Sequence, residues 1–242
     1  MNHKAGQLKL DGTIALVTGG SRGIGLAIAQ ELAREGVDVV LVARDAKALE
    51  QARNSLKSKT GAIAADVREP RDVDRVFKTV QKRYGRLDVL VNCAGVFTYK
   101  PFPKTTLEDW RNNIETNLTS LFLTTKAALP LLARAKRPQI VNILSVASQQ
   151  AFPNCSAYAA AKFGALGLTR VLREELRAQK IRVTAIFPGP TETEMIKEFG
   201  FEIPSARLMQ PEDVAAVVVT ALKQPARTAV EEISLRPAGG SI

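Results

Sequence analysis

The stretch "TIALVTGGSRGIG", residues 13–25, joins a short apolar run to a glycine-rich turn and to the start of an amphipathic pattern that ends at Gly36. The apolar run is typical of a buried β-strand, and the pattern after it is typical of an α-helix. Glycines at such a turn let the backbone approach a phosphate closely, and the helix start offers free N–H groups and the positive end of its dipole. The stretch therefore favours the first unit of a nucleotide-binding α/β fold, with a purely structural turn as the alternative.

Apolar runs and helical patterns alternate along the rest of the chain. The runs are mostly continuous, as in parallel strands that are buried on both faces. Their alternation with helical patterns predicts βαβ units and a parallel sheet covered by helices. We expect strands at 13–18, 37–43, 61–66, 87–92, 139–145, 181–187 and 230–236. We expect helices at 23–36, 46–58, 70–84, 106–135, 156–179 and 211–223.

No linker, low-complexity tract or repeat divides these elements, so we expect one doubly wound α/β domain over residues 1–242. Residues from 1 to about 10 are expected to form a loose extension. The longest irregular piece, about 188–210, follows a strand and is expected to cover the ligand at the carboxyl edge of the sheet.

Composition narrows the classes of protein and of site. A chain of 242 residues can bury a core without disulfides or metal, and its two cysteines, Cys93 and Cys155, exclude a disulfide framework. The single histidine, His3, argues against histidine metal sites and histidine acid/base chemistry. Because the chain has no signal-peptide core and no apolar run of membrane length, we expect a cytoplasmic protein with no metal and no membrane contact.

The net charge of +10 raises the question of an anionic partner. Lys and Arg are spread along the chain, and their densest group, "RAKR" at 134–137, is short. A solvated basic surface is therefore the favoured interpretation, and we expect no nucleic-acid partner. A preference for anionic ligands or acidic partners is an intermediate alternative.

The end of the second expected strand indicates which nucleotide is bound. NAD enzymes usually place an acid there to bond the ribose 2′-hydroxyl. This chain has "VLVARD" at 40–45, with Arg44 at that end, and Arg22 in the glycine turn can reach the same region. Two guanidinium groups suit a 2′-phosphate, so we expect NADP(H) rather than NAD(H). Asp45 keeps NAD open, and solvent-facing arginines are the structural alternative.

Tyr158 and Lys162 are four residues apart and share one face of an expected helix. A phenol has a pKa of about 10 and needs a nearby cation to exchange protons near neutrality. Lys162 and a positively charged cofactor ring could supply it, which makes Tyr158 the candidate acid/base. The same spacing also occurs by chance, but Ser145 at a strand end and Asn117 in an apolar helical face strengthen the catalytic interpretation.

These residues match a known family. The chain resembles the short-chain dehydrogenases/reductases over nearly its whole length, including members similar to the 3-oxoacyl-carrier-protein reductases. The family motifs stand at Thr18–Gly25 (T-G-x-x-x-G-x-G), Asp66, Asn92–Gly95 (N-x-A-G), Pro188–Gly189, and the set Asn117, Ser145, Tyr158 and Lys162. Departures from the common pattern include Leu144 before the serine, Cys93 in N-x-A-G, and "RPAGG" near the end.

The resemblance implies a Rossmann-type sheet of seven parallel strands in the order 3-2-1-4-5-6-7, with helices on both faces. It implies that Tyr158 exchanges the proton, Lys162 lowers the Tyr158 pKa and bonds the nicotinamide ribose, Ser145 holds the substrate oxygen, and Asn117 binds a relay water. The cofactor-binding residues would be Gly19, Ser21, Arg22, Gly23, Ile24, Gly25, Arg44, Asp66, Val67, Asn92, Ala94, Gly95, Tyr158, Lys162, Pro188, Gly189, Thr191 and Thr193.

The activity expected from this resemblance is hydride transfer between nicotinamide and a carbonyl or secondary alcohol. A dinucleotide-binding sensor or scaffold without turnover is the alternative. The substrate would be shaped by 95–104 and 188–210, whose aromatic residues favour an apolar carbonyl compound, and an acidic acyl carrier is an option for a basic chain. Small residues in the helix at 156–179 and the resemblance together imply a homodimer or homotetramer.

Overall fold

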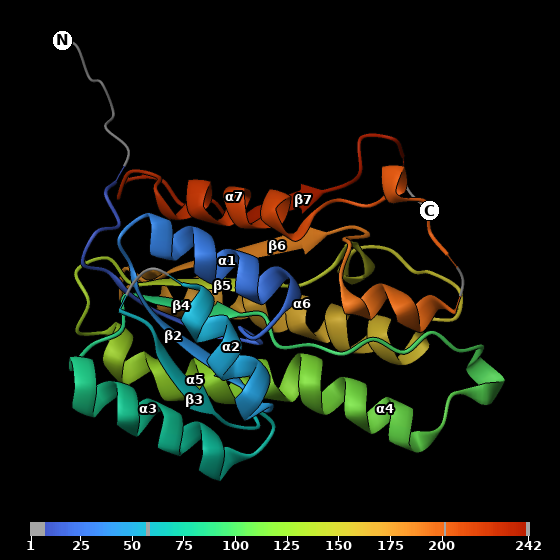
Figure 1. Ribbon diagram of the computed structural model, residues 1–242, viewed down its shortest axis with the longest axis horizontal. Helices are drawn as coiled ribbons and strands as arrows, with labels where there is room; N and C mark the ends of the chain where they lie inside the picture. The colour runs from blue at the N-terminus through green and yellow to red at the C-terminus, as the bar shows by residue number, and fades with distance from the viewer. Residues whose placement is uncertain (1–7, 57–58, 201, 241–242) are drawn as a thin grey trace.

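The apolar runs form seven parallel strands in the order β3-β2-β1-β4-β5-β6-β7 in the computed structural model, which describes residues 8–56, 59–200 and 202–240 (Figure 1). The strands are β1 Ile14–Thr18, β2 Asp38–Ala43, β3 Gly61–Ala64, β4 Val89–Asn92, β5 Gln139–Ile143, β6 Arg182–Pro188 and β7 Glu232–Leu235. All neighbouring strands pair in parallel. The predicted doubly wound sheet and its strand order are confirmed.

Helices cover both faces of this sheet (Figure 1). The α-helices are α1 Gly23–Arg34, α2 Ala46–Ser55, α3 Pro70–Tyr84, α4 Leu107–Ile114, α5 Ser120–Leu132, α6 Ser156–Arg177 and α7 Pro211–Leu222. The buried side chains of α1, α2 and α7 pack on one face, and those of α3, α5 and α6 pack on the other.

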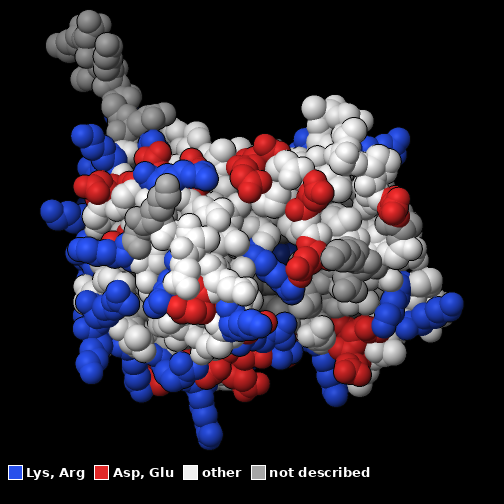
Figure 2. Space-filling model, in the orientation of Figure 1, with Lys and Arg blue, Asp and Glu red and all other residues white. Residues whose placement is uncertain are grey.

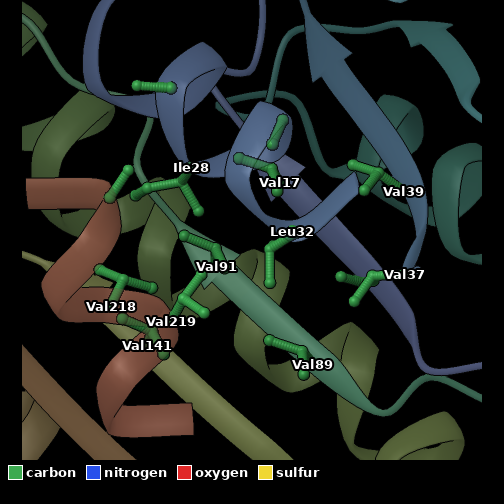
Figure 3. Packing of buried hydrophobic residues seen from close by; sticks show 14 of the residues in the cluster. Val17, Ile28, Leu32, Val37, Val39, Val89, Val91, Val141, Val218 and Val219 are labelled. Atoms are coloured by element: carbon green, nitrogen blue, oxygen red, sulfur yellow. The ribbon is translucent and has the colours of Figure 1, made fainter. Parts of the chain in front are cut away.

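The first face shows why these sequences fold together. Ile28 and Leu32 are one turn apart on α1 and are fully buried, together with Val17 and Val91 of the sheet and Val218 of α7 (Figure 3). Burying one such side chain contributes about 1.5–3 kcal/mol relative to leaving it in water. The period-3.6 pattern of α1 therefore fixes its side chains on the sheet, and α1 in turn carries the glycine turn at its start.

The stretch expected as one helix at 106–135 is continuous but not uniformly α-helical. Between α4 and α5 lies a π-helical turn, η2 Glu115–Thr119, which contains Asn117. Such turns are rare and occur mostly at functional sites. The third and fifth expected strands each end two residues earlier than predicted, β3 at Ala64 and β5 at Ile143, so Asp66 and Ser145 stand beyond the strand ends.

A buried polar network ties the middle of the sheet to its helices. The Asn92 amide nitrogen donates to Asn142 Oδ1 on the neighbouring strand at 2.9 Å and to Thr125 Oγ1 at 3.0 Å. Thr124 Oγ1 donates to Asn92 Oδ1 at 2.7 Å, and the Asn142 amide nitrogen reaches Thr169 of α6 at 2.9 Å. Because every member finds a partner, the network fixes α5 and α6 against β4 and β5.

The expected loose extension falls mostly outside the described residues, as does His3. Its described end is attached to the fold: the Leu8 N–H donates to the Lys223 carbonyl at 2.9 Å, and Leu10 is buried in the core. Within the described part of the chain, no helix is both long enough and apolar enough to cross a membrane.

Charged side chains of both signs cover the face shown in Figure 2, and Lys and Arg gather along its left and lower edges. Basic and acidic side chains are thus interspersed on this face.

Gly25 tests the packing of the glycine turn. An alanine Cβ there would lie 2.3 Å from the Gly19 carbonyl oxygen, so the backbone of the turn would have to move. We expect Gly25→Ala to lower the free energy of unfolding by at least about 2 kcal/mol in urea denaturation. Gln30→Ala on the same helix, at a half-exposed position, is the control and should change it by less than about 0.5 kcal/mol. Equal stability of the two variants would contradict the packing argument.

Candidate active site

The glycine turn and the segment after β4 are held together at the carboxyl edge of the sheet. Thr18 Oγ1 accepts the N–H groups of Cys93 at 3.0 Å and Ala94 at 3.1 Å. Gly19 has a φ of +67°, and a Cβ there would lie 2.9 Å from Ala94 Cα. Only glycine combines this left-handed backbone with so close an approach.

The start of α1 is built to receive an anion. Arg22 stands at the N-cap in extended conformation, and no side chain caps the first turn. The first N–H groups of a helix have no partner inside the helix, and they lie at the positive end of its dipole. The absence of a side chain at Gly25 lets the helix begin directly against the turn. These residues fit the pyrophosphate of a dinucleotide.

A cleft with a volume of about 1570 Å³ runs along this edge of the sheet. Nearly all the residues expected to bind cofactor or substrate line it. They are Gly19, Ser21, Arg22, Gly23, Ile24, Gly25, Arg44, Asp66, Val67, Ala94, Gly95, Ser145, Tyr158, Lys162, Pro188, Gly189, Thr191 and Thr193. Among the described residues, no three His, Cys, Asp or Glu side chains group as a metal site would require.

Asn92 and Asn117 do not line the cleft. Asn92, expected to bind cofactor, points its amide into the network described above, so its side chain joins strands and helices instead. The Asn117 amide lies behind the cleft wall, where it accepts the Val96 N–H at 3.1 Å and donates to the Val96 carbonyl at 3.0 Å. Asn117 therefore fixes the backbone of the segment that follows Gly95.

Asp45 is committed to the start of α2. Its carboxylate accepts the N–H groups of Lys47 at 2.9 Å and Ala48 at 3.0 Å, which makes it an N-cap. Its neighbour Arg44 is exposed and lines the cleft. Asp45, the residue that left binding of NAD(H) as an alternative, thus already has backbone hydrogen-bond partners.

Asp66, expected beside the adenine, is paired with Arg68, which the sequence analysis did not single out. The Arg68 guanidinium bonds both carboxylate oxygens at 2.6–3.0 Å and, aided by Arg44, holds the pKa of Asp66 below its usual value. Arg68 also lines the cleft. The acid–x–base spacing in "DVR" is the signal that could have revealed this pair.

Ser145, Tyr158 and Lys162 converge at the other end of the cleft. Ser145 caps the short helix η3 Val146–Ser148, and its side chain lies close enough to Tyr158 to lower the pKa of the phenol. Lys162 Nζ lies 5.7 Å from the centroid of the Tyr158 ring and donates to the Ile143 carbonyl at 3.1 Å. A Cβ on Gly95 would lie 3.9 Å from Lys162 Nζ and 2.9 Å from Asn117 Oδ1, so Asn117 stands close to Lys162 but behind the wall that Gly95 forms.

Burial opposes the charged forms of both Tyr158 and Lys162. It raises the pKa of Tyr158 to about 12, and the hydrogen bond from Ser145 offsets only part of this effect. It lowers the pKa of Lys162 to about 8. Burial therefore dominates the pKa of Tyr158 in the protein without a bound cofactor. The expected lowering of this pKa by Lys162 together with a positive cofactor ring stays a prediction.

Aromatic rings line the cleft next to Tyr158. The Phe97 ring meets the Tyr158 ring edge-on, with centroids 4.8 Å apart. Phe199 lies 4.9 Å from Phe97 and 5.0 Å from Tyr99. Phe199 ends the short helix η4 Glu194–Phe199, which belongs to the piece at 188–210 expected to cover the ligand.

Arg22 already has a partner in that piece. Its guanidinium forms an exposed ion pair with Glu194, a residue that the sequence analysis did not single out. Thr193 lies next to it, and its Cγ2 would be 3.2 Å from a Cβ on Gly23. The segment after β6 therefore touches the glycine turn across the cleft. Arg22 and Glu194 are 172 positions apart, so no local sequence pattern could predict this pair.

Comparison with known proteins gives close relatives over the whole chain. The chain is 39% identical over 239 residues to sepiapterin reductase of Chlorobaculum tepidum, covering 95% of this chain and 98% of that one. It is 36% identical over 244 residues to a 3-oxoacyl-[acyl-carrier-protein] reductase of Synechocystis, with 96% and 98% covered. It is also 36% identical to glycine betaine reductase of Emericella nidulans, but spans only 19% of that longer protein.

Solved structures are similar over nearly the same length. An alcohol dehydrogenase from Thermococcus sibiricus, complexed with 5-hydroxy-NADP, superimposes with a TM-score of 0.88 at 29% identity, covering 95% of this chain and 98% of that one. A 3-ketoacyl-(acyl-carrier-protein) reductase from Brucella melitensis, complexed with NADH, also gives 0.88 at 27% identity, with 95% and 98% covered.

The model of the short chain dehydrogenase family matches residues 13–202, from the first strand into the segment after β6. The match includes the glycine turn and every residue of the catalytic end. The chain therefore belongs to the short-chain dehydrogenase/reductase family, and it is an NAD(P)-dependent oxidoreductase that acts on carbonyl or alcohol groups by hydride transfer.

Proposed function

We propose that this chain is an NADP(H)-dependent carbonyl reductase or alcohol dehydrogenase in which Tyr158 exchanges the proton with the substrate oxygen. The observation that carries the proposal is the convergence of Tyr158, Ser145 and Lys162 at the cleft end opposite the Asp66–Arg68 pair. A single elongated cleft thus offers an anion-binding turn, a basic residue at the second strand and a proton-transfer group. This is the set that a nicotinamide oxidoreductase needs.

The glycine turn and the start of α1 would hold the cofactor pyrophosphate. Arg44 and Arg22 would hold a 2′-phosphate, and the commitment of Asp45 to α2 supports NADP(H) over NAD(H). Asp66 and Val67 would lie at the adenine, and Pro188, Gly189, Thr191 and Thr193 at the nicotinamide end. When bound, the cofactor supplies the hydride chemistry and a positive ring in its oxidised form.

The protein's part of the reaction is to position and protonate. The Ser145 hydroxyl, which lies close to Tyr158, would hold the substrate oxygen within reach of the phenol. In reduction Tyr158 gives its proton to that oxygen, and in oxidation it takes the proton from the alcohol. Lys162 would contact the nicotinamide ribose, and Asn117 would keep the wall at Val96 in register and support a water leading to Lys162.

The cleft next to Tyr158 suggests the substrate class. Phe97, Tyr99 and Phe199 offer ring faces and edges, which favour an apolar or aromatic carbonyl compound. Two relatives act on acyl chains held by a carrier protein, and the positive charge of this chain is compatible with such an acidic carrier.

We also propose that two copies of the chain associate through the outer face of α6. Phe163 and Val171 are 45% and 52% exposed, and Gly167 between them has no atom within 4 Å of the position of an added Cβ. An apolar stripe with a glycine at its centre suits the close approach of a second helix.

Replacing Tyr158 by Phe tests the proton-transfer role. The variant keeps the ring that packs on Phe97 but loses the hydroxyl, so we expect kcat for reduction of a panel ketone to fall at least about 100-fold. Tyr99→Phe removes a hydroxyl from another ring of the cleft and should change kcat less than about threefold. Unchanged turnover in Tyr158→Phe would defeat the proposed role.

Replacing Arg44 by Asp tests the cofactor preference. We expect the NADPH dissociation constant to rise at least about tenfold, because a charge-assisted contact is lost and a repulsion is gained, while NADH binding changes little. Arg71→Asp makes the same charge change on α3, at an exposed position outside the cleft, and should leave both constants within about twofold. A variant at Arg44 that retains the full preference for NADPH would show that this arginine does not hold the phosphate.

Placing a long charged side chain at the centre of the α6 stripe tests the association. Gly167→Arg has room within one chain, so we expect a folded monomer in analytical ultracentrifugation where the unaltered chain is a dimer or tetramer. Gln81→Arg on α3, also an exposed position, should leave the assembly intact. If Gly167→Arg is still an oligomer, the interface does not lie on the outer face of α6.

A further inference from the structure

The ion pair between Arg22 and Glu194 lies where the two sides of the cleft meet. Arg22 belongs to the glycine turn, and Glu194 begins η4 in the segment after β6. Both residues line the cleft. The side chains are 68% and 60% exposed, so water screens the attraction and the pair is easily exchanged for a stronger partner.

Neighbouring contacts keep Glu194 in this place. On one side Thr193 touches Gly23, with its Cγ2 3.2 Å from the position of an added Cβ. At the far end of η4, Phe199 packs 4.9 Å from Phe97 and 5.0 Å from Tyr99. Since both ends of the segment are in contact with the rest of the fold, the Glu194 carboxylate is held facing the guanidinium of Arg22.

Under the proposed function, on which this inference rests, Arg22 has two possible anionic partners. A 2′-phosphate carries about two negative charges near neutral pH, and it would take Arg22 from Glu194 and be repelled by the freed carboxylate. A 2′-hydroxyl carries no charge and leaves the pair with Glu194 intact. Glu194 therefore weakens the binding of NADP(H) and leaves the binding of NAD(H) unchanged.

We propose that Glu194 is a specificity-determining residue that weakens the binding of 2′-phosphorylated nucleotides by competing for Arg22, and that NADP(H) displaces it from that arginine. The preference for NADP(H) set by Arg22 and Arg44 is thus held below the value that the two arginines alone would give.

Binding measurements on Glu194→Gln test this without turnover. The change keeps the size of the side chain and removes its charge. By isothermal titration calorimetry we expect NADPH and 2′,5′-ADP to bind about three- to fivefold more tightly, the upper part of the range available to one exposed charge interaction. NADH and 5′-AMP should bind within about twofold of their affinity for the unaltered chain.

Glu192→Gln is the matched control. It makes the same charge change two residues earlier, but Glu192 accepts a hydrogen bond from Gln210 at 2.6 Å and does not line the cleft. It should leave all four affinities within about twofold, as distant exposed charges are largely screened. In an Arg22→Ala background, the gain from Glu194→Gln should fall to less than about twofold, because no guanidinium remains to be competed for.

The outcomes separate the two proposals. If the unaltered chain binds neither NADPH nor NADH, the proposed function fails and this inference fails with it. If the unaltered chain binds NADPH and Glu194→Gln binds it equally or more weakly, only the competition is overturned. Weaker binding would make Glu194 a residue that orients Arg22 toward the phosphate. A gain that is the same for NADPH and NADH would also overturn it, because it would not depend on the 2′-phosphate.

Discussion

The hydroxyl of Thr18 accepts two backbone N–H groups from the segment after β4, and this joint fixes the distance between the first and the fourth strand ends. The close contact of Gly19 with Ala94 follows from it, and so does the position of α1, whose first turn stands directly against the same backbone. The cofactor cleft is the space left beside this joint. This joint positions the groups that would contact a nucleotide. They extend from the free N–H groups of α1 to the wall at Gly95 and Val96.

At the end of the cleft that holds Tyr158 and Lys162, burial works against the charged forms that proton transfer would use. Packing Tyr158 and Lys162 almost out of water makes both charged forms unfavourable, with the pKa of the phenol raised to about 12 and that of the amine lowered to about 8. Under the proposed function, a bound positive ring and ribose hydroxyls would favour the phenolate form that burial opposes.

The sequence predicted the sheet because continuous apolar runs and a glycine turn are local features, and it predicted the residues that line the cleft because the family motifs fall on strand ends. It did not reveal which way a side chain points. Asn92 stands at a strand end as expected, yet its amide serves the network with Asn142 and Thr125. The role of Asp45 as an N-cap was readable from "RDAKALE", whereas the pairing of Arg22 with Glu194 depends on the folded path of a segment far along the chain.

The π-helical turn Glu115–Thr119 restricts the number of residues in its helix as strictly as it restricts their identity. Successive residues of a helix are rotated by about 100°, so loss of one residue here would swing everything beyond it around the axis. Asn117 holds Val96 from within the turn, and Thr124 holds Asn92 from the helix beyond it, so the number of residues between them sets how these two contacts face the sheet. Single-residue deletions between α4 and α5 should therefore be excluded during divergence of this protein, even where substitutions on the outer surface of the same helix are freely accepted.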